Sequence, residues 1–133
     1  MNKRVVENYI PFAIEAIDEM IEKNNGLVVD QEKKILNEVF NGYIATLGAS
    51  IIQSGLVPSI AFFLNENQSS EADRKLVIEL VEKILRKDKK LPQKKDLLTY
   101  CFENSVDEAT EDTINAAIAI KLAFRTYSLV KEE

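Results

Sequence analysis

Apolar residues recur at helical spacing along most of the chain and predict a bundle of helices. Residues three or four positions apart share one face of a helix, so a repeating apolar pair marks a buried stripe. The first stripe predicts a helix over residues 3–23, in which Pro11 either introduces a kink or starts a new helix. Asn24-Asn25-Gly26 ends this helix. The stripe consists of Val6, Tyr9, Ile10, Ala13, Ile17, Met20 and Ile21.

The same spacing predicts a second helix over residues 30–54, with Asp30 as its N-terminal cap. Its buried face should carry the pairs Ile35/Leu36, Val39/Phe40, Tyr43/Ile44 and Ile51/Ile52. Small residues form a separate stripe on this helix, and we expect another helix to approach it closely. The stripe consists of Gly42, Ala45 and Ala49. Gly55 suits a left-handed helix end, and Pro58 begins a short third helix.

Three more helices are predicted in the second half of the chain. Ser70 and Asp73 resemble a capping box before a helix that ends near residue 87, and a short helix follows over residues 97–102. Ser105 and Glu108 form a better capping box before a last helix that should reach residue 131. That helix is apolar on nearly all sides. We interpret it as a surface for self-association or partner docking, and the alternative is a central helix buried inside the fold.

The whole pattern predicts one all-α domain over residues 1–133, a compact bundle of five to six helices. A chain of 133 residues with 46% hydrophobic and 29% charged residues is long enough and apolar enough to form its own core. No signal peptide or membrane-spanning stretch is present in the sequence, so we expect a cytoplasmic protein without a membrane partner.

The composition excludes several kinds of catalytic site. There is no histidine, so histidine-based nucleophile pairs and imidazole metal sites are ruled out, and a single Cys101 excludes an internal disulfide. We therefore expect no catalytic residue, no metal site and no cofactor. The acidic cluster of the first helix is interpreted as a solvated face; it consists of Glu15, Asp18, Glu19 and Glu22. An enzyme that works through carboxylates and lysines alone is the weaker alternative.

Charge is distributed unevenly along the chain. The net charge is −5, yet residues 74–95 contain nine basic and three acidic residues, which leaves a net charge of −11 on the rest. This segment is either a lysine-rich solvated loop or a face that binds anions. Contacts to RNA there would be to phosphates and blind to sequence. The candidate RNA-binding residues are Lys83, Arg86, Lys87, Lys89, Lys90, Lys94 and Lys95, with Lys121 and Arg125 on the last helix as a second candidate surface.

One stretch resembles a known family. Residues 43–64 read YIATLGASIIQSGLVPSIAFFL, in which a helix ends in an Ile-x-x-Ser-Gly-Leu turn and an Ala-Phe-x-Leu helix follows. This pattern resembles the small helical subunit of the Cmr complex, the type III-B CRISPR RNA-guided effector. The matching residues are Ile51, Ser54, Gly55, Leu56, Ala61, Phe62 and Leu64. In the last helix, where that family carries Trp-Leu-Lys-Arg, only Arg125 matches.

The resemblance implies a non-catalytic subunit of an antiviral complex. Its expected partners are the other Cmr subunits, above all the backbone subunit, and copies of itself that stack along that backbone. The guide RNA is held by the backbone, and the small subunits help to hold the target RNA. The alternative function is a helical adaptor that binds only protein and uses its acidic body to meet a basic partner.

Overall fold

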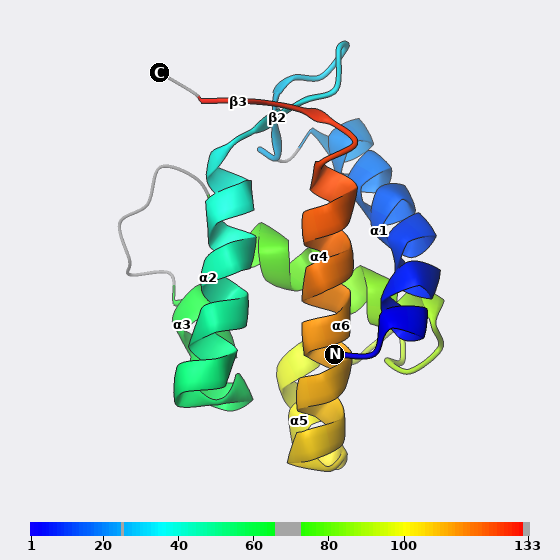
Figure 1. The fold of residues 1–133 in the computed structure, drawn as a ribbon, viewed down its shortest axis with the longest axis vertical. Helices are drawn as coiled ribbons and strands as arrows, with labels where there is room; N and C mark the ends of the chain where they lie inside the picture. Colours follow the sequence, from blue (N-terminus) through cyan, green and yellow to red (C-terminus); the bar gives the residue numbers. More distant parts are fainter. Residues whose placement is uncertain (25, 66–72, 132–133) are drawn as a thin grey trace.

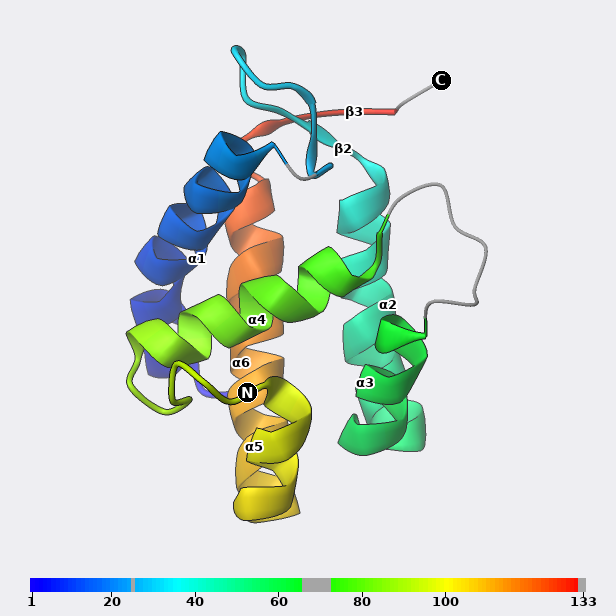
Figure 2. The same ribbon diagram turned by 180° about the vertical axis from the view of Figure 1, so that it is seen from behind.

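Helix α6 (Val106–Phe124) runs through the middle of the fold, between α1 (Lys3–Lys23) and α2 (Val39–Ser54). In the computed structural model these three helices lie side by side, and α4 (Lys75–Lys87) crosses one face of the layer they form (Figures 1 and 2). Helices α3 (Leu56–Leu64) and α5 (Leu97–Glu103) complete the bundle. The structure describes residues 1–24, 26–65 and 73–131. The mostly helical single domain predicted from the sequence is confirmed.

Helix α1 follows its predicted bounds. The side chain of Asn2 accepts hydrogen bonds from the backbone N–H groups of Arg4 and Val5, which caps the N-terminus. The helix continues through Pro11, so this residue does not start a new helix. At the other end Asn24 adopts a left-handed conformation with φ 51° and caps the last turn.

The second helix begins later than predicted, because residues before it form strands. Strand β1 (Val28–Asp30) pairs antiparallel with β2 (Ile35–Asn37), and helix α2 starts only at Val39. Asp30 is therefore not a helix cap. Its carboxylate accepts from the N–H of Lys33 within the turn between the strands, and Lys34 closes that turn at φ 54°.

The last helix ends earlier than predicted for the same reason. Helix α6 stops at Phe124, and β3 (Ser128–Val130) pairs parallel with β2 from the far end of the chain. Leu129 thereby pairs with the buried Leu36. The apolar residues Ile35, Leu36 and Leu129 fit helical spacing. They form strands instead, because β2 pairs with β3 from a distant part of the chain. The fold is a helical bundle with a small three-stranded sheet at one end.

The small-residue stripe of α2 makes no close contact with a neighbouring helix. Gly42, Ala45 and Ala49 are exposed, and a Cβ added at Gly42 would have no neighbour within 4 Å. The prediction of a close helix contact there is wrong within this chain. Bulkier residues bury α2 instead, since a larger apolar side chain removes more surface from water; they are Phe40, Ile44, Leu47 and Ile51.

The capping box before the last helix is confirmed, because the Ser105 hydroxyl accepts from the N–H of Glu108 at the start of α6. Gly55 ends α2 as predicted, but at φ 94° and ψ 166°, outside the left-handed helical conformation, and α3 begins at Leu56 and not at Pro58. Ser70 of the other capping box is outside the described residues. Helices α4 and α5 fall where the apolar spacing predicts them.

Helix α6 occupies the central position given above as the alternative, and part of its apolar surface stays exposed. One side is central and carries small side chains that let the neighbouring helices approach closely: Ala109, Ala116, Ala119 and Ala123 are fully buried. The opposite strip is only half covered, because Ile114, Ile118 and Leu122 retain exposed surface. The helix is therefore internal along most of its circumference, with an apolar strip left toward solvent.

Candidate functional site

The predicted basic segment occupies the end of α4 and the loop that leads to α5. Figure 2 shows this loop beside α1, on the side of the molecule where α4 crosses the helical layer. Charged and backbone groups of α1, α5 and α6 surround the segment. The seven candidate residues of the segment therefore differ in how available their charges are.

Two of the candidates are paired with α1. The Nζ atom of Lys87 lies 2.7 Å from one oxygen of Glu19 and 3.4 Å from Glu15, and Lys83 lies 3.8 Å from Glu19. The hydrogen bond from Lys87 lowers the pKa of Glu19, and the same bond raises the pKa of Lys87. The acidic residues predicted to be a solvated face thus partly serve to hold α4 against α1.

Two more candidates are paired farther along the loop. Lys90 Nζ donates to Asp112 Oδ1 over 2.7 Å, and Lys95 Nζ donates to Glu103 over 2.5 Å. Asp112 lies on α6 and is 4% exposed, so this ion pair fastens the loop to the central helix. The hydrogen bond to Asp112 raises the pKa of Lys90.

Asp112 also joins the loop to α5 through tyrosine. Its second oxygen, Oδ2, accepts from the hydroxyl of Tyr100 over 2.6 Å, so both carboxylate oxygens are used. Burial, followed by the bond to Asp112, raises the pKa of Tyr100. A parallel contact from Tyr9 on α1 to Asp88 Oδ2 over 2.5 Å fixes the start of the loop. These bonds hold the basic segment against α1, α5 and α6.

Arg86 connects the two ends of the same segment. Its Nη2 donates to the backbone carbonyl of Lys95 over 2.9 Å, which ties the end of α4 to the far side of the loop. The guanidinium is only partly exposed, so its main contact here is structural.

Lys89 and Lys94 differ from the other candidates. Both are exposed, and neither takes part in an ion pair with any residue that the structure describes. Lys89 lies just after the end of α4 at φ 63°, in the left-handed region. The loop therefore presents two uncompensated lysine charges to solvent.

The second candidate surface is separate from this loop. Lys121 and Arg125 are exposed on α6. Lys121 is nine residues beyond Asp112, which is about 13 Å along a helix axis. The structure therefore does not combine the two sets of basic residues into one patch.

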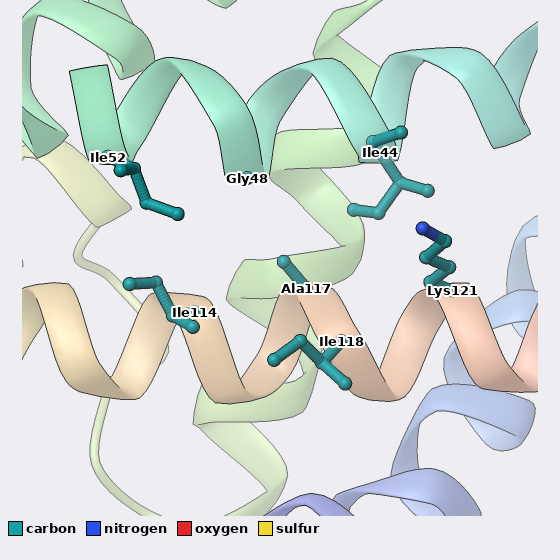
Figure 3. Close-up of a pocket in the computed structure, with 8 residues that line it drawn as sticks. Ile44, Gly48, Ile52, Ile114, Ala117, Ile118 and Lys121 are labelled. Carbon is teal, nitrogen blue, oxygen red and sulfur yellow. The ribbon is translucent and has the colours of Figure 1, made fainter. Parts of the chain in front are cut away.

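An apolar groove borders Lys121, between α2 and α6 (Figure 3). Figure 3 shows Ile52 and Ile114 at one end of it and Ile44 near Lys121 at the other. Ile52 is 80% exposed, so its predicted place on the buried face of the second helix is wrong. The groove has a volume of about 160 Å³, and the remaining lining comes from Ala45, Gly48, Ala117 and Ile118.

A charge pattern in the sequence also indicates this surface, which was not among the predicted binding surfaces. Residues 39–65 contain no aspartate, glutamate, lysine or arginine, although 29% of the whole chain is charged. A stretch of 27 residues would carry about eight charges at that frequency. Protein interfaces are depleted in charge at their centre. The uncharged face of α2 and α3 next to an open groove therefore has the composition of a protein-binding surface.

Residues 7–122 match the family of CRISPR-associated proteins named Cas_Cmr5. The chain belongs to this family. A Cas_Cmr5 protein is a structural subunit of the Cmr complex and assembles with other Cmr subunits, which confirms the resemblance seen at residues 43–64. Neither the curated proteins nor the solved structures contain a match to this member of Cas_Cmr5.

Two further findings concern the described part of this Cas_Cmr5 chain. None of its helices there is long and apolar enough to cross a membrane. Among the same residues, no group of three or more cysteine, aspartate or glutamate side chains is placed to hold a metal ion.

Proposed function

We propose that this chain is a non-catalytic subunit of the type III-B CRISPR effector that stacks along the complex and helps to hold target RNA. The observation that carries the proposal is the separation of two surfaces on one small molecule. The uncharged face of α2 and α3 suits contacts with protein. The loop after α4 presents Lys89 and Lys94 for contacts with phosphate.

Within this proposal the seven basic residues of the segment contribute unequally. A phosphate reaches Lys89 or Lys94 without displacing a carboxylate, whereas Lys90 must first leave the buried Asp112. We therefore assign the main RNA contacts to Lys89 and Lys94, and auxiliary contacts to Lys90 and Lys95. Lys83, Arg86 and Lys87 add positive potential at the base of the loop while holding it in place.

The test uses the assembled Cmr complex with its guide RNA, in which a double variant, Lys89→Gln with Lys94→Gln, replaces the wild-type subunit. Each lost phosphate contact lowers the slope of log affinity against log salt by roughly 0.7–0.9. We expect weaker target-RNA binding and a slope that is flatter by about 1.5 for each incorporated copy that touches RNA. The control is Lys33→Gln with Lys34→Gln, which removes two exposed charges at the β1–β2 turn; Lys34 is paired with Asp18 over 3.6 Å.

Two results would overturn the proposal. Unchanged RNA affinity and salt slope in the Lys89/Lys94 variant would leave the loop as a solvated segment and favour the adaptor that binds only protein. In that case Lys121 and Arg125 become the surface to test next. Metal-dependent RNA cleavage by the purified subunit, abolished by a single carboxylate-to-alanine change, would contradict the non-catalytic role.

A further inference from the structure

We propose that the groove between α2 and α6 receives the side chain of Phe102 from a second copy of this chain. The inference rests on the proposed stacking and specifies the residues that produce it. It follows from the size of the groove, from an exposed aromatic ring elsewhere on the molecule, and from the charges that flank each of them.

The groove has the dimensions of an aromatic side chain. Its volume of about 160 Å³ is close to that of an apolar cavity of roughly 150 Å³ that admits a benzene ring. Isoleucine and alanine side chains line it, and Gly48 leaves room on the α2 side, since a Cβ added there would have no neighbour within 4 Å. Figure 3 shows isoleucines of both helices around this space.

Phe102 is the projecting ring that fits it. The residue lies near the end of α5 and is 70% exposed, more than any other aromatic side chain among the described residues. Val106 at the start of α6 is also exposed, at 59%. Phe62 is less exposed, and the guanidinium of Arg74 already lies 4.3 Å above its ring. Water contact with a free phenylalanine ring is unfavourable, so an aromatic pocket-filling contact stabilises association.

The charges around the two surfaces are complementary. Asp107 and Glu108 follow the projection on the first turn of α6, and both are exposed. Lys121 borders the groove, and Arg125 is one turn farther along the same helix. Exposed ion pairs contribute little affinity, but opposite charges at the two surfaces determine which orientation of the partner is favoured.

The projection and the groove lie on different parts of the molecule. Helix α5 and the start of α6 form one end of the bundle, whereas the groove lies along the flank between α2 and α6 (Figure 1). A contact between unlike surfaces leaves one projection and one groove free at the ends of every row. Copies joined in this way add one after another, as stacking requires.

Two variants and their mixture test the contact in the purified full chain. Phe102→Ser removes the projection, and Gly48→Phe fills the groove from within. Both positions are open in the folded chain, so circular dichroism and melting temperature should show intact folding. Val29→Ser, which changes another exposed apolar residue on strand β1, is the matched control.

Analytical ultracentrifugation over a concentration series gives the decisive result. Wild type and Val29→Ser should form rows of increasing length, and each of the other two variants alone should stay monomeric. An equimolar mixture should form dimers and nothing longer, because the Gly48→Phe copy keeps its projection and the Phe102→Ser copy keeps its groove.

Three results would overturn the inference: wild type that stays monomeric at millimolar concentration, single variants that associate as wild type does, or a mixture without dimers. Each of them would exclude the contact between Phe102 and the groove of a second copy. None of these results bears on the proposed RNA contacts, because target-RNA affinity is measured separately with the Lys89/Lys94 variant in the assembled complex. Unchanged target-RNA affinity and salt slope in the Lys89/Lys94 variant, together with dimer formation in the mixture, would instead refute the proposed RNA contacts alone.

Discussion

Replacement of Asp112 by alanine should destabilise the fold more than any change to the exposed ion pairs. Asp112 is 4% exposed, and its two oxygens accept from Lys90 and Tyr100 over 2.7 and 2.6 Å. It joins α6 to the loop and to α5 at once. Removing its carboxylate therefore leaves a buried tyrosine hydroxyl and a lysine without their partner.

The magnitude follows from the burial of the two donors. Tyr100 is 5% exposed, and losing a hydrogen bond to a charged acceptor at such a site costs about 1.5–3 kcal/mol. The side chain of Lys90 is 37% exposed and turns to water, so its share is at most about 1 kcal/mol. We expect Asp112→Ala to lower the free energy of unfolding by about 2–4 kcal/mol.

Urea unfolding followed by circular dichroism measures this value, and a double-mutant cycle with Tyr100→Phe tests its cause. Because both changes remove the same bond, the double variant should be more stable than the sum predicts, by at least about 1 kcal/mol. The neighbouring Glu111→Ala is the control and should cost less than about 1 kcal/mol, since Glu111 is an exposed partner of the N-terminal ammonium. A loss below about 1 kcal/mol for Asp112→Ala, or strict additivity with Tyr100→Phe, would refute this reasoning.

Two other predictions concern single residues. Gly42→Ala should stabilise the isolated chain by about 0.5–1 kcal/mol, because alanine favours a helix and its Cβ meets no neighbour here; a lower melting temperature would show a hidden contact. Burial raises the pKa of the Cys101 thiol from 9.0 to about 11, so the folded chain holds this proton more tightly than the unfolded chain does. The free energy of unfolding of the wild type should therefore fall as pH rises between about 9 and 11. It should fall more steeply than that of Cys101→Ala, by about 1 kcal/mol per pH unit, and the same pH dependence in both proteins would contradict this.

Helices were predictable from the sequence where local spacing alone decides the structure. The stripe from Val6 to Ile21 defines α1 to within a residue, and Gly55 and Ser105 mark helix ends through their own backbone conformation and hydroxyl. The sheet was not predictable in this way. Leu36 pairs with Leu129 across more than ninety positions of the chain, and no local period distinguishes such a pair from helical neighbours.

In the candidate site, too, the local features were predictable from the sequence and the contacts between distant segments were not. The excess of lysine in residues 74–95 is visible in the sequence, but the partners of those lysines are not. Glu19 comes from α1 and Asp112 from α6, so only the folded chain separates the paired Lys87 and Lys90 from the unpaired Lys89 and Lys94. Ile52 illustrates the opposite error, since apolar spacing places it inside and the structure leaves it exposed.

These pairings matter for the proposed role of this acidic chain in holding RNA. The net charge is −5, and four lysines of the basic segment are paired with carboxylates: Lys83, Lys87, Lys90 and Lys95. A lone copy therefore offers RNA only about two uncompensated lysine charges at the loop. Two phosphate contacts give weak binding that salt readily removes. Copies joined through Phe102 and the groove would present the same pair at a regular interval, and linked weak contacts add to a much stronger hold than any one of them. Under the proposed function, an isolated copy would therefore bind RNA weakly, and a row of copies in the assembled complex would bind it tightly.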